Sequence, residues 1–214
     1  ALGFCALMLD DLPKAYGAYQ QALLNLGTVV DPMIWYGIGI LYDRYGSDEH
    51  ALEAYGLAIK LLTKRASTTG NLPPNTPNTP NTPTKLIRDI YYRMAVLFRC
   101  RRKWDAAIRC FEYVMADPPA GFSSDDIKMQ IALVEATRGT PESLVAAKET
   151  LLGLIASAAA ANRPQRLAMA QCHLAWLNSR NGEEAALSIL TQTASADSAN
   201  PLPHYYTGRL YARL

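Results

Sequence analysis

This chain has little excess of one charge over the other, and it has no long hydrophobic run. Twenty-one Lys and Arg residues against nineteen Asp and Glu give a formal net charge of +2, which does not indicate nucleic-acid binding by itself. No run reaches the roughly 18 apolar residues of a membrane span, and no signal peptide is visible. We expect no direct nucleic-acid contact and no membrane. Because the chain begins with Ala1 and ends at Leu214 inside a helical pattern, we expect a fragment of a longer protein.

Metal ligands and catalytic groups are also sparse. The histidines are His50, His173 and His204, and the cysteines are Cys5, Cys100, Cys110 and Cys172. No C-x-x-C, H-x-x-x-H or Gly-rich phosphate loop occurs. Cys172 and His173 are adjacent on an expected helix, so their side chains point about 100° apart. We predict no enzyme activity, no catalytic residue, no metal and no cofactor, with reduced and mostly buried thiols and histidines that pack or lie on the surface.

One stretch, residues 31 to 60, carries a packing pattern. It matches the tetratricopeptide (TPR) pattern W-x2-L-G-x2-Y…A-x3-F, with Ile and Tyr as replacements, at Trp35, Ile38, Gly39, Tyr42, Ala51 and Tyr55. Gly39 lets a second helix approach closely, and Tyr55 fills the space beside it. One such hairpin cannot bury its face alone, so further repeats are expected.

The pattern recurs along the chain and gives the domain organisation. We predict an all-α TPR solenoid, a right-handed superhelix of helical hairpins. Residues 1–62 hold repeats 1 and 2, the first truncated and with a longer loop near 28–30. Residues 63–85, which contain Asn-Thr-Pro repeats, form a disordered insertion, and residues 86–214 hold repeats 3 to 5 plus the first helix of a sixth.

Several residues have the chemistry of helix N-caps. Asp31 precedes Pro32, and Ser123 has capping-box spacing to Asp126. The other expected helix starts are Asp11, Ser47 and Thr140.

Three segments are similar to one family. They are WYGIGILYDRYGS (35–47), KWDAAIRCFEYVMADPPAGFSSDDIKMQI (103–131) and SADSANPLPHYYTGRLY (195–211). They resemble the TPR subunit of the fungal general transcriptional corepressor, the partner of a Tup-type WD-repeat corepressor. His204 and Lys128 stand where that family favours Trp. Ala95, Ala132 and Ala175 replace Gly.

The resemblance implies a nuclear protein–protein interaction scaffold. Its partners would be the Tup-type WD-repeat corepressor, DNA-bound transcription factors and chromatin-associated proteins. Two alternatives stay open: the regulatory TPR region of a JmjC-type histone demethylase, and a generic TPR assembly scaffold.

Projection on the helical period predicts a partner-binding set on the first helices, which line the concave face of TPR arrays. Its members are Tyr36, Ile40, Arg44, Tyr92, Val96, Arg99, Met129, Leu133, Trp176, Arg180, Tyr205 and Arg209. Aromatic and aliphatic residues beside Arg suit an amphipathic acidic helix or an extended peptide. Some of these residues could instead pack between repeats. The basic stretch 85–103 is either a solvated helix or a contact for acidic partners.

Overall fold

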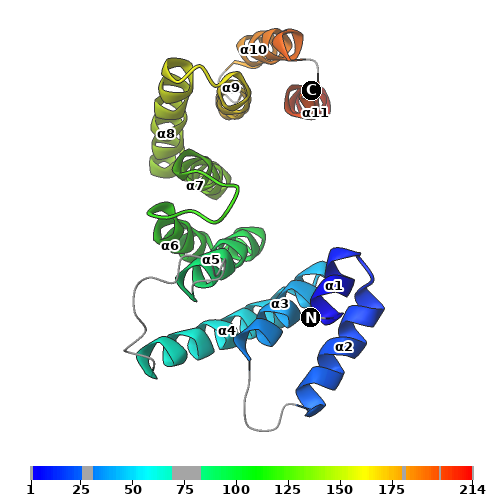
Figure 1. Cartoon of the computed structure of the whole chain (residues 1–214). Coiled ribbons are helices and arrows are strands. Elements are labelled where there is room, and N and C mark those ends of the chain that lie inside the picture. Colours follow the sequence, from blue (N-terminus) through cyan, green and yellow to red (C-terminus); the bar gives the residue numbers. More distant parts are fainter. Residues whose placement is uncertain (1, 26–30, 69–82, 180–181, 198, 214) are drawn as a thin grey trace. The chain divides into compact units, whose positions relative to one another are not determined.

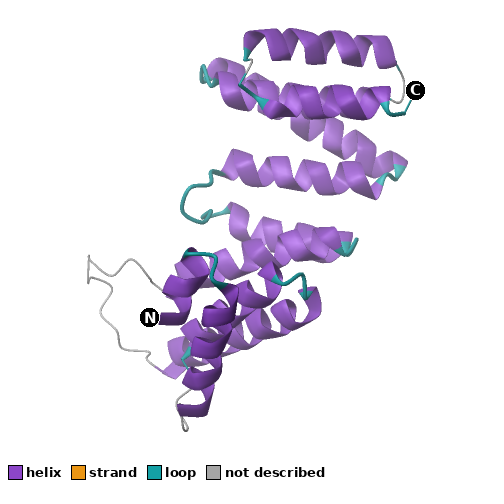
Figure 2. Ribbon diagram, turned by 90° about the vertical axis from the view of Figure 1, so that its right-hand side faces the viewer, coloured by secondary structure: helices purple, strands orange, loops and turns teal. Residues whose placement is uncertain are grey.

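The computed structural model describes residues 2–25, 31–68, 83–179, 182–197 and 199–213. The chain forms two compact units, Ala1–Arg101 and Arg102–Leu214. Every regular element in the described residues is a helix, as Figure 2 shows. The predicted all-α class is therefore confirmed.

Each unit is a succession of helices (Figure 1). The helices of the first unit are α1 (Leu2–Met8), α2 (Leu12–Asn25), α3 (Pro32–Arg44), α4 (Asp48–Thr68) and α5 (Pro83–Cys100). Those of the second are α6 (Trp104–Met115), α7 (Ser124–Arg138), α8 (Pro141–Ala160), α9 (Pro164–Asn178), α10 (Glu183–Ala196) and α11 (Pro201–Tyr211).

The expected N-caps start these helices. The Asp31 carboxylate accepts from the Met33 amide at 3.1 Å, and Asp11 accepts from the Lys14 amide at 3.2 Å. Ser123 and Asp126 form the predicted capping box, and Thr140 accepts from the Ser143 amide. These bonds satisfy amides that have no partner within their own helix. Ser47 directly precedes α4, and its hydroxyl lies 2.8 Å from His50 Nδ1.

The close helix approach predicted at Gly39 is present in the α3–α4 hairpin. A Cβ atom at Gly39 would overlap the ring of Tyr55, which is fully buried. The α1–α2 hairpin repeats the contact, because a Cβ at Gly3 would lie 3.0 Å from the Tyr19 ring. Tyr19 also fills the space over Gly37 on α3, so this ring joins one hairpin to the next. The glycine–tyrosine pairs thus set how closely these helices pack.

Four of the turns between paired helices share one backbone conformation in the described residues. Asp10, Gly46, Arg102 and Gly139 each follow a first helix, and each has φ between 57° and 77°. Glycine adopts this left-handed region without the steric cost that Asp10 and Arg102 meet. The shared geometry supports the repeat assignment.

The helices that flank the Asn-Thr-Pro segment extend into the predicted insertion. Helix α4 continues to Thr68 and α5 starts at Pro83, so the predicted bounds 63–85 were too wide. Residues 63–68 contain no proline, and a proline is tolerated at the first position of a helix. Residues 69–82, and the longer loop expected near 28–30, lie outside the described residues.

Helix α5 packs with the first unit. Its residues Leu86, Ile87 and Ile90 belong to the same hydrophobic cluster as Ala58 and Leu62 of α4. The division into compact units consequently falls after Arg101, inside the predicted third repeat. The boundaries of the repeats stay a prediction.

Helix α8 is long and apolar enough to cross a membrane by length and composition alone. It carries Glu142, Lys148 and Glu149, however, and it packs between α7 and α9. Ala147, Leu151 and Leu154 of α8 join the core of that packing. We therefore interpret α8 as the second helix of a hairpin.

Three arginines at the ends of first helices pair with acids near earlier turns. Arg44 lies 2.7 Å from Asp10, and Arg138 lies 2.9 Å from Asp105. Arg101 lies 2.5 Å from Glu49. The first two pairs are separated by 34 and 33 residues in the sequence, about one TPR period. The ion pairs therefore connect successive repeats at equivalent places.

Removing one of these pairs should have a small effect that depends on salt. We expect Arg138→Ala to lower the free energy of unfolding by about 0.2–1 kcal/mol at low salt, because exposed ion pairs contribute little. The difference from the unchanged protein should nearly vanish at roughly 1 M salt, where charges are screened within about 3 Å. Urea unfolding at both salt concentrations measures it; an effect equal at both would contradict an electrostatic role.

Candidate partner-binding site

In the first unit, two of the predicted binding residues are buried. Tyr36 and Ile40 of α3 have relative exposures of 7% and 8%. Arg44 is exposed and holds its pair with Asp10. On α5, Tyr92, Val96 and Arg99 are half-buried.

Tyr36 belongs to a polar network between α3 and α5. Its hydroxyl donates to the Asp89 carboxylate, and Arg93 Nε donates to Tyr36 Oη and Asp89 Oδ2, both at 3.3 Å. Burial, together with the bond to Asp89, raises the pKa of Tyr36 to about 12. Asp89 and Arg93 are four residues apart on one helix, so this ion pair could have been predicted from the sequence. Their bonds to Tyr36, more than 50 residues away, have no sequence signal.

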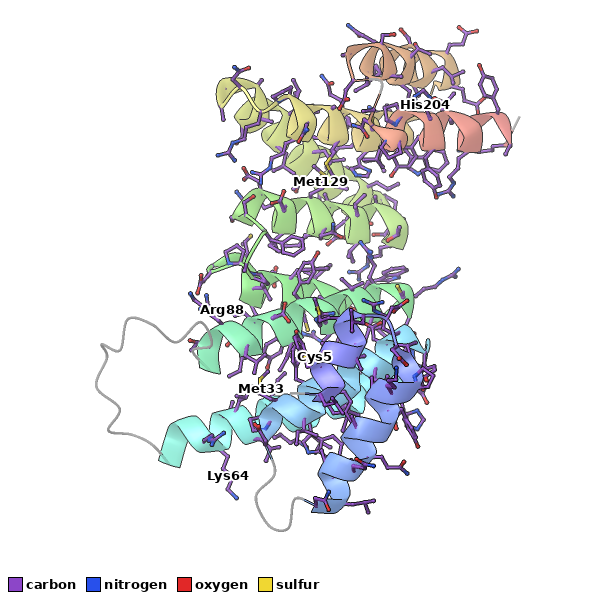
Figure 3. All side chains as sticks on the ribbon, turned by 45° about the vertical axis from the view of Figure 1, so that its right-hand side comes forward. Cys5, Met33, Lys64, Arg88, Met129 and His204 are labelled. Carbon is purple, nitrogen blue, oxygen red and sulfur yellow. The ribbon has the colours of Figure 1, made fainter. Side chains whose placement is uncertain are left out.

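Part of the basic stretch is neutralised within this unit. Arg93 pairs with Asp89, and Arg101 pairs with Glu49. Arg88, labelled on α5 in Figure 3, also makes an interaction. These contacts favour a largely structural role for the helical part of residues 85–103.

In the second unit, the predicted residues lie on α7, α9 and α11. Met129, labelled in Figure 3, is 8% exposed on α7, and Leu133 is half-buried. Trp176 is half-buried on α9, whereas Tyr205 and Arg209 of α11 are exposed. Arg180 lies outside the described residues.

The structure brings three of these residues together. The Arg209 guanidinium carbon lies 4.6 Å from the centre of the Trp176 ring and 5.7 Å from that of Tyr205. Arg209 Nη1 also donates to Tyr205 Oη at 3.4 Å. Cation–π contacts of this kind hold the guanidinium against the rings. Trp176, Tyr205 and Arg209 therefore form one partly exposed group, which we call the aromatic–arginine cluster.

Two buried residues, which the sequence analysis did not select, pack against this cluster. The Trp176 ring stacks on Tyr206, with centres 5.4 Å apart and planes 22° apart. Tyr206 Oη lies 2.7 Å from His173 Nδ1, and both side chains are 7% exposed. Burial lowers the pKa of His173 to about 4 and raises the pKa of Tyr206 to about 12. The cluster thus rests on a neutral, hydrogen-bonded pair.

The remaining histidines and the cysteines show no shared site. His50 and His204 are exposed, so the expected surface or packing roles fit all three histidines. Cys110 and Cys172 are buried, and burial raises the pKa of Cys110 to about 11. Cys5 and Cys100 are exposed, so the prediction of mostly buried thiols was wrong for these two cysteines. Within the described ranges, no three His, Cys, Asp or Glu side chains gather to hold a metal.

Comparison with solved structures bears on the fold. A putative kinesin light chain from Podosopora anserina with nearly identical TPR-like repeats superposes with a TM-score of 0.63. The alignment covers 90% of each chain, at 15% sequence identity. At that identity the similarity concerns the fold alone, and it supports the TPR assignment. No protein-family model matches the chain.

Comparison with curated proteins bears on the relationship. The general transcriptional corepressor trfA of Dictyostelium discoideum is 59% identical over 69 residues, or 32% of this chain. The general transcriptional corepressor ssn6 of Schizosaccharomyces pombe is 61% identical over 61 residues, or 28% of this chain. Over about a third of its length, this chain is similar to two proteins named as general transcriptional corepressors. The resemblance seen in the sequence is therefore confirmed.

The similarity to these corepressors covers a small part of each relative. The aligned segments span 5% of trfA and 6% of ssn6. Both relatives are named as corepressors, which disfavours the JmjC-type demethylase alternative for this TPR chain.

Proposed function

We propose that this TPR chain is a non-enzymatic scaffold of a general transcriptional corepressor. It links DNA-bound transcription factors to a Tup-type WD-repeat corepressor and to chromatin-associated proteins, and it acts in the nucleus. The observation that carries the proposal is the identity of 59% over 69 residues and of 61% over 61 residues to two proteins named as general transcriptional corepressors.

The structure adds a physical reason for a binding role. TPR hairpins expose side chains on their first helices, and here those helices carry aromatic residues beside arginine. Aromatic residues and arginine dominate the binding energy of many protein interfaces. The exposed and half-buried residues of the predicted set remain our candidates, with the aromatic–arginine cluster first among them, whereas Tyr36, Ile40 and Met129 are buried.

A tethering experiment tests the function. The chain is fused to a sequence-specific DNA-binding domain and directed to a reporter promoter in fungal cells with and without the Tup-type corepressor. We expect reporter output to fall only in cells that contain the WD-repeat partner. Unchanged output in those cells, with the fusion protein folded and nuclear, would contradict the proposal. The chain without the DNA-binding domain is the control.

A further inference from the structure

We propose that the aromatic–arginine cluster of Trp176, Tyr205 and Arg209 binds an acidic peptide in which a carboxylate lies beside an apolar side chain. The inference rests on the proposed scaffold function and adds the place and the chemistry of one of its contacts. The carboxylate would bind Arg209, while the apolar side chain would pack on the exposed aromatic rings.

The first argument is that Arg209 has N–H donors that are available to a partner. Within the described part of the chain its hydrogen bond goes to Tyr205 Oη, at 3.4 Å, and no carboxylate pairs with it. A guanidinium carries five N–H donors in a planar fork that matches a carboxylate in a bidentate arrangement. Arg209 is exposed, so an incoming carboxylate can reach these donors.

The second argument is that the guanidinium is already held in place. Its position over Trp176, at 4.6 Å, restricts the side chain before any partner arrives. Trp176 is in turn fixed by its stack on buried Tyr206. Binding then has to immobilise fewer side chains, so it costs less conformational entropy.

The third argument is charge complementarity. Helices α9 and α11, which pack together, contain no Asp or Glu. Their arginines are Arg166, which pairs with Asp126, and Arg209. Arg213 follows α11 and is exposed. An acidic partner would meet no like charge from these two helices.

The fourth argument is the exposed apolar area beside the charge. Tyr205 is 55% exposed, and the neighbouring Trp176 is half-buried. Rings like these give large contact areas with few rotatable bonds. A single-stranded nucleic acid could also stack on aromatic rings, but it needs a basic groove along its backbone. The described cluster contains one arginine, Arg209, so the partner that we propose is a peptide.

Fluorescence anisotropy with a labelled peptide tests the proposal. The probe is Asp-Asp-Phe-Asp-Asp-Leu, and the control peptide carries Asn at each Asp. We expect the acidic peptide to bind and the Asn peptide to bind at least about tenfold more weakly, because charge-assisted bonds are the strong ones. Equal binding of both peptides, or tighter binding of an oligo(dT) probe, would overturn the inference.

Matched variants locate the contact. Arg209→Gln should weaken binding of the acidic peptide roughly 10- to 100-fold, as expected for a lost hydrogen bond to a charged group. Arg109→Gln, an equal charge change at an exposed position on α6, should change affinity less than about twofold. Arg209→Lys keeps the charge but loses the planar fork, so its affinity should fall between the two. Equal effects of Arg209→Gln and Arg109→Gln would place the contact elsewhere.

Tyr205→Ala gives a second test that leaves Arg209 in place, and it should also weaken binding. Circular dichroism confirms that each variant is folded. Tethered repression that persists while the acidic peptide fails to bind would overturn this inference and leave the proposed function standing. Loss of repression with intact peptide binding would do the reverse.

Discussion

Tyr55→Ala should lower the free energy of unfolding of the Ala1–Arg101 unit by about 3–5 kcal/mol, the range measured for other large buried aromatic side chains. Tyr55 is fully buried, and its ring occupies the space that Gly39 leaves open. The substitution removes this packing and leaves a cavity between α3 and α4. Urea unfolding followed by circular dichroism measures the change.

Two further variants separate packing from other causes. Tyr55→Phe should change the free energy of unfolding little, because Tyr55 Oη is buried without a hydrogen bond of normal geometry and interacts weakly with Arg93. Phe is also the residue of the TPR pattern at this position. Gly39→Ala should destabilise the protein by about 1–3 kcal/mol by overpacking against the Tyr55 ring. In the Tyr55→Ala background the same Gly39 substitution should be neutral or stabilising. Additive effects in the double variant would show that the two residues do not contact each other.

Acidification should destabilise the Arg102–Leu214 unit through His173. In the unfolded chain this histidine has a pKa near 6.5, and in the folded protein burial lowers the pKa to about 4. Between these values the unfolded state binds more protons, so stability is complete above pH 6.5 and is lost as the pH falls toward 4. The difference between the two pKa values corresponds to a loss of about 3 kcal/mol.

The pH dependence has an internal control in the other histidines. His173→Gln should remove most of the loss between pH 6.5 and 4, whatever its effect on stability at neutral pH. His204→Gln, at an exposed position, should leave the pH profile unchanged. Denaturant unfolding at half-unit pH steps gives the profile. A His173→Gln protein that retains the full slope would show that carboxylates, and not His173, cause it.

The sequence predicted the features that depend on local chemistry. Gly39 with Tyr55, and Ser123 with Asp126, follow from short-range spacing, because a glycine and the ring on its paired helix, or a cap and its return bond, act within one hairpin. Helix class and most helix starts were likewise accessible. The C-terminal end of α4 was not accessible. The prolines indicate that a helix must break, but they do not show how far it continues before them.

The side-chain contacts between distant helices were not accessible from the sequence. The projection selected Tyr36 as a binding residue, but its hydroxyl is bound to Asp89, and Arg93 donates to it. Helical period tells which stripe a residue is on, and it does not tell whether a neighbouring helix already covers that stripe. For the same reason Trp176 and Arg209 were selected separately, while their stacking on each other emerged only in the structure.

Hydrogen exchange tests the central claim most directly, namely that first helices carry the binding surface. Amide exchange of the chain is measured with and without the N-terminal helical segment of the Tup-type WD-repeat corepressor. We predict that exchange slows in α3, α5, α7, α9 and α11, where local opening is suppressed by the partner. Protection confined to the second helices α4, α6, α8 and α10, or no protection at a saturating concentration of the segment, would contradict the account.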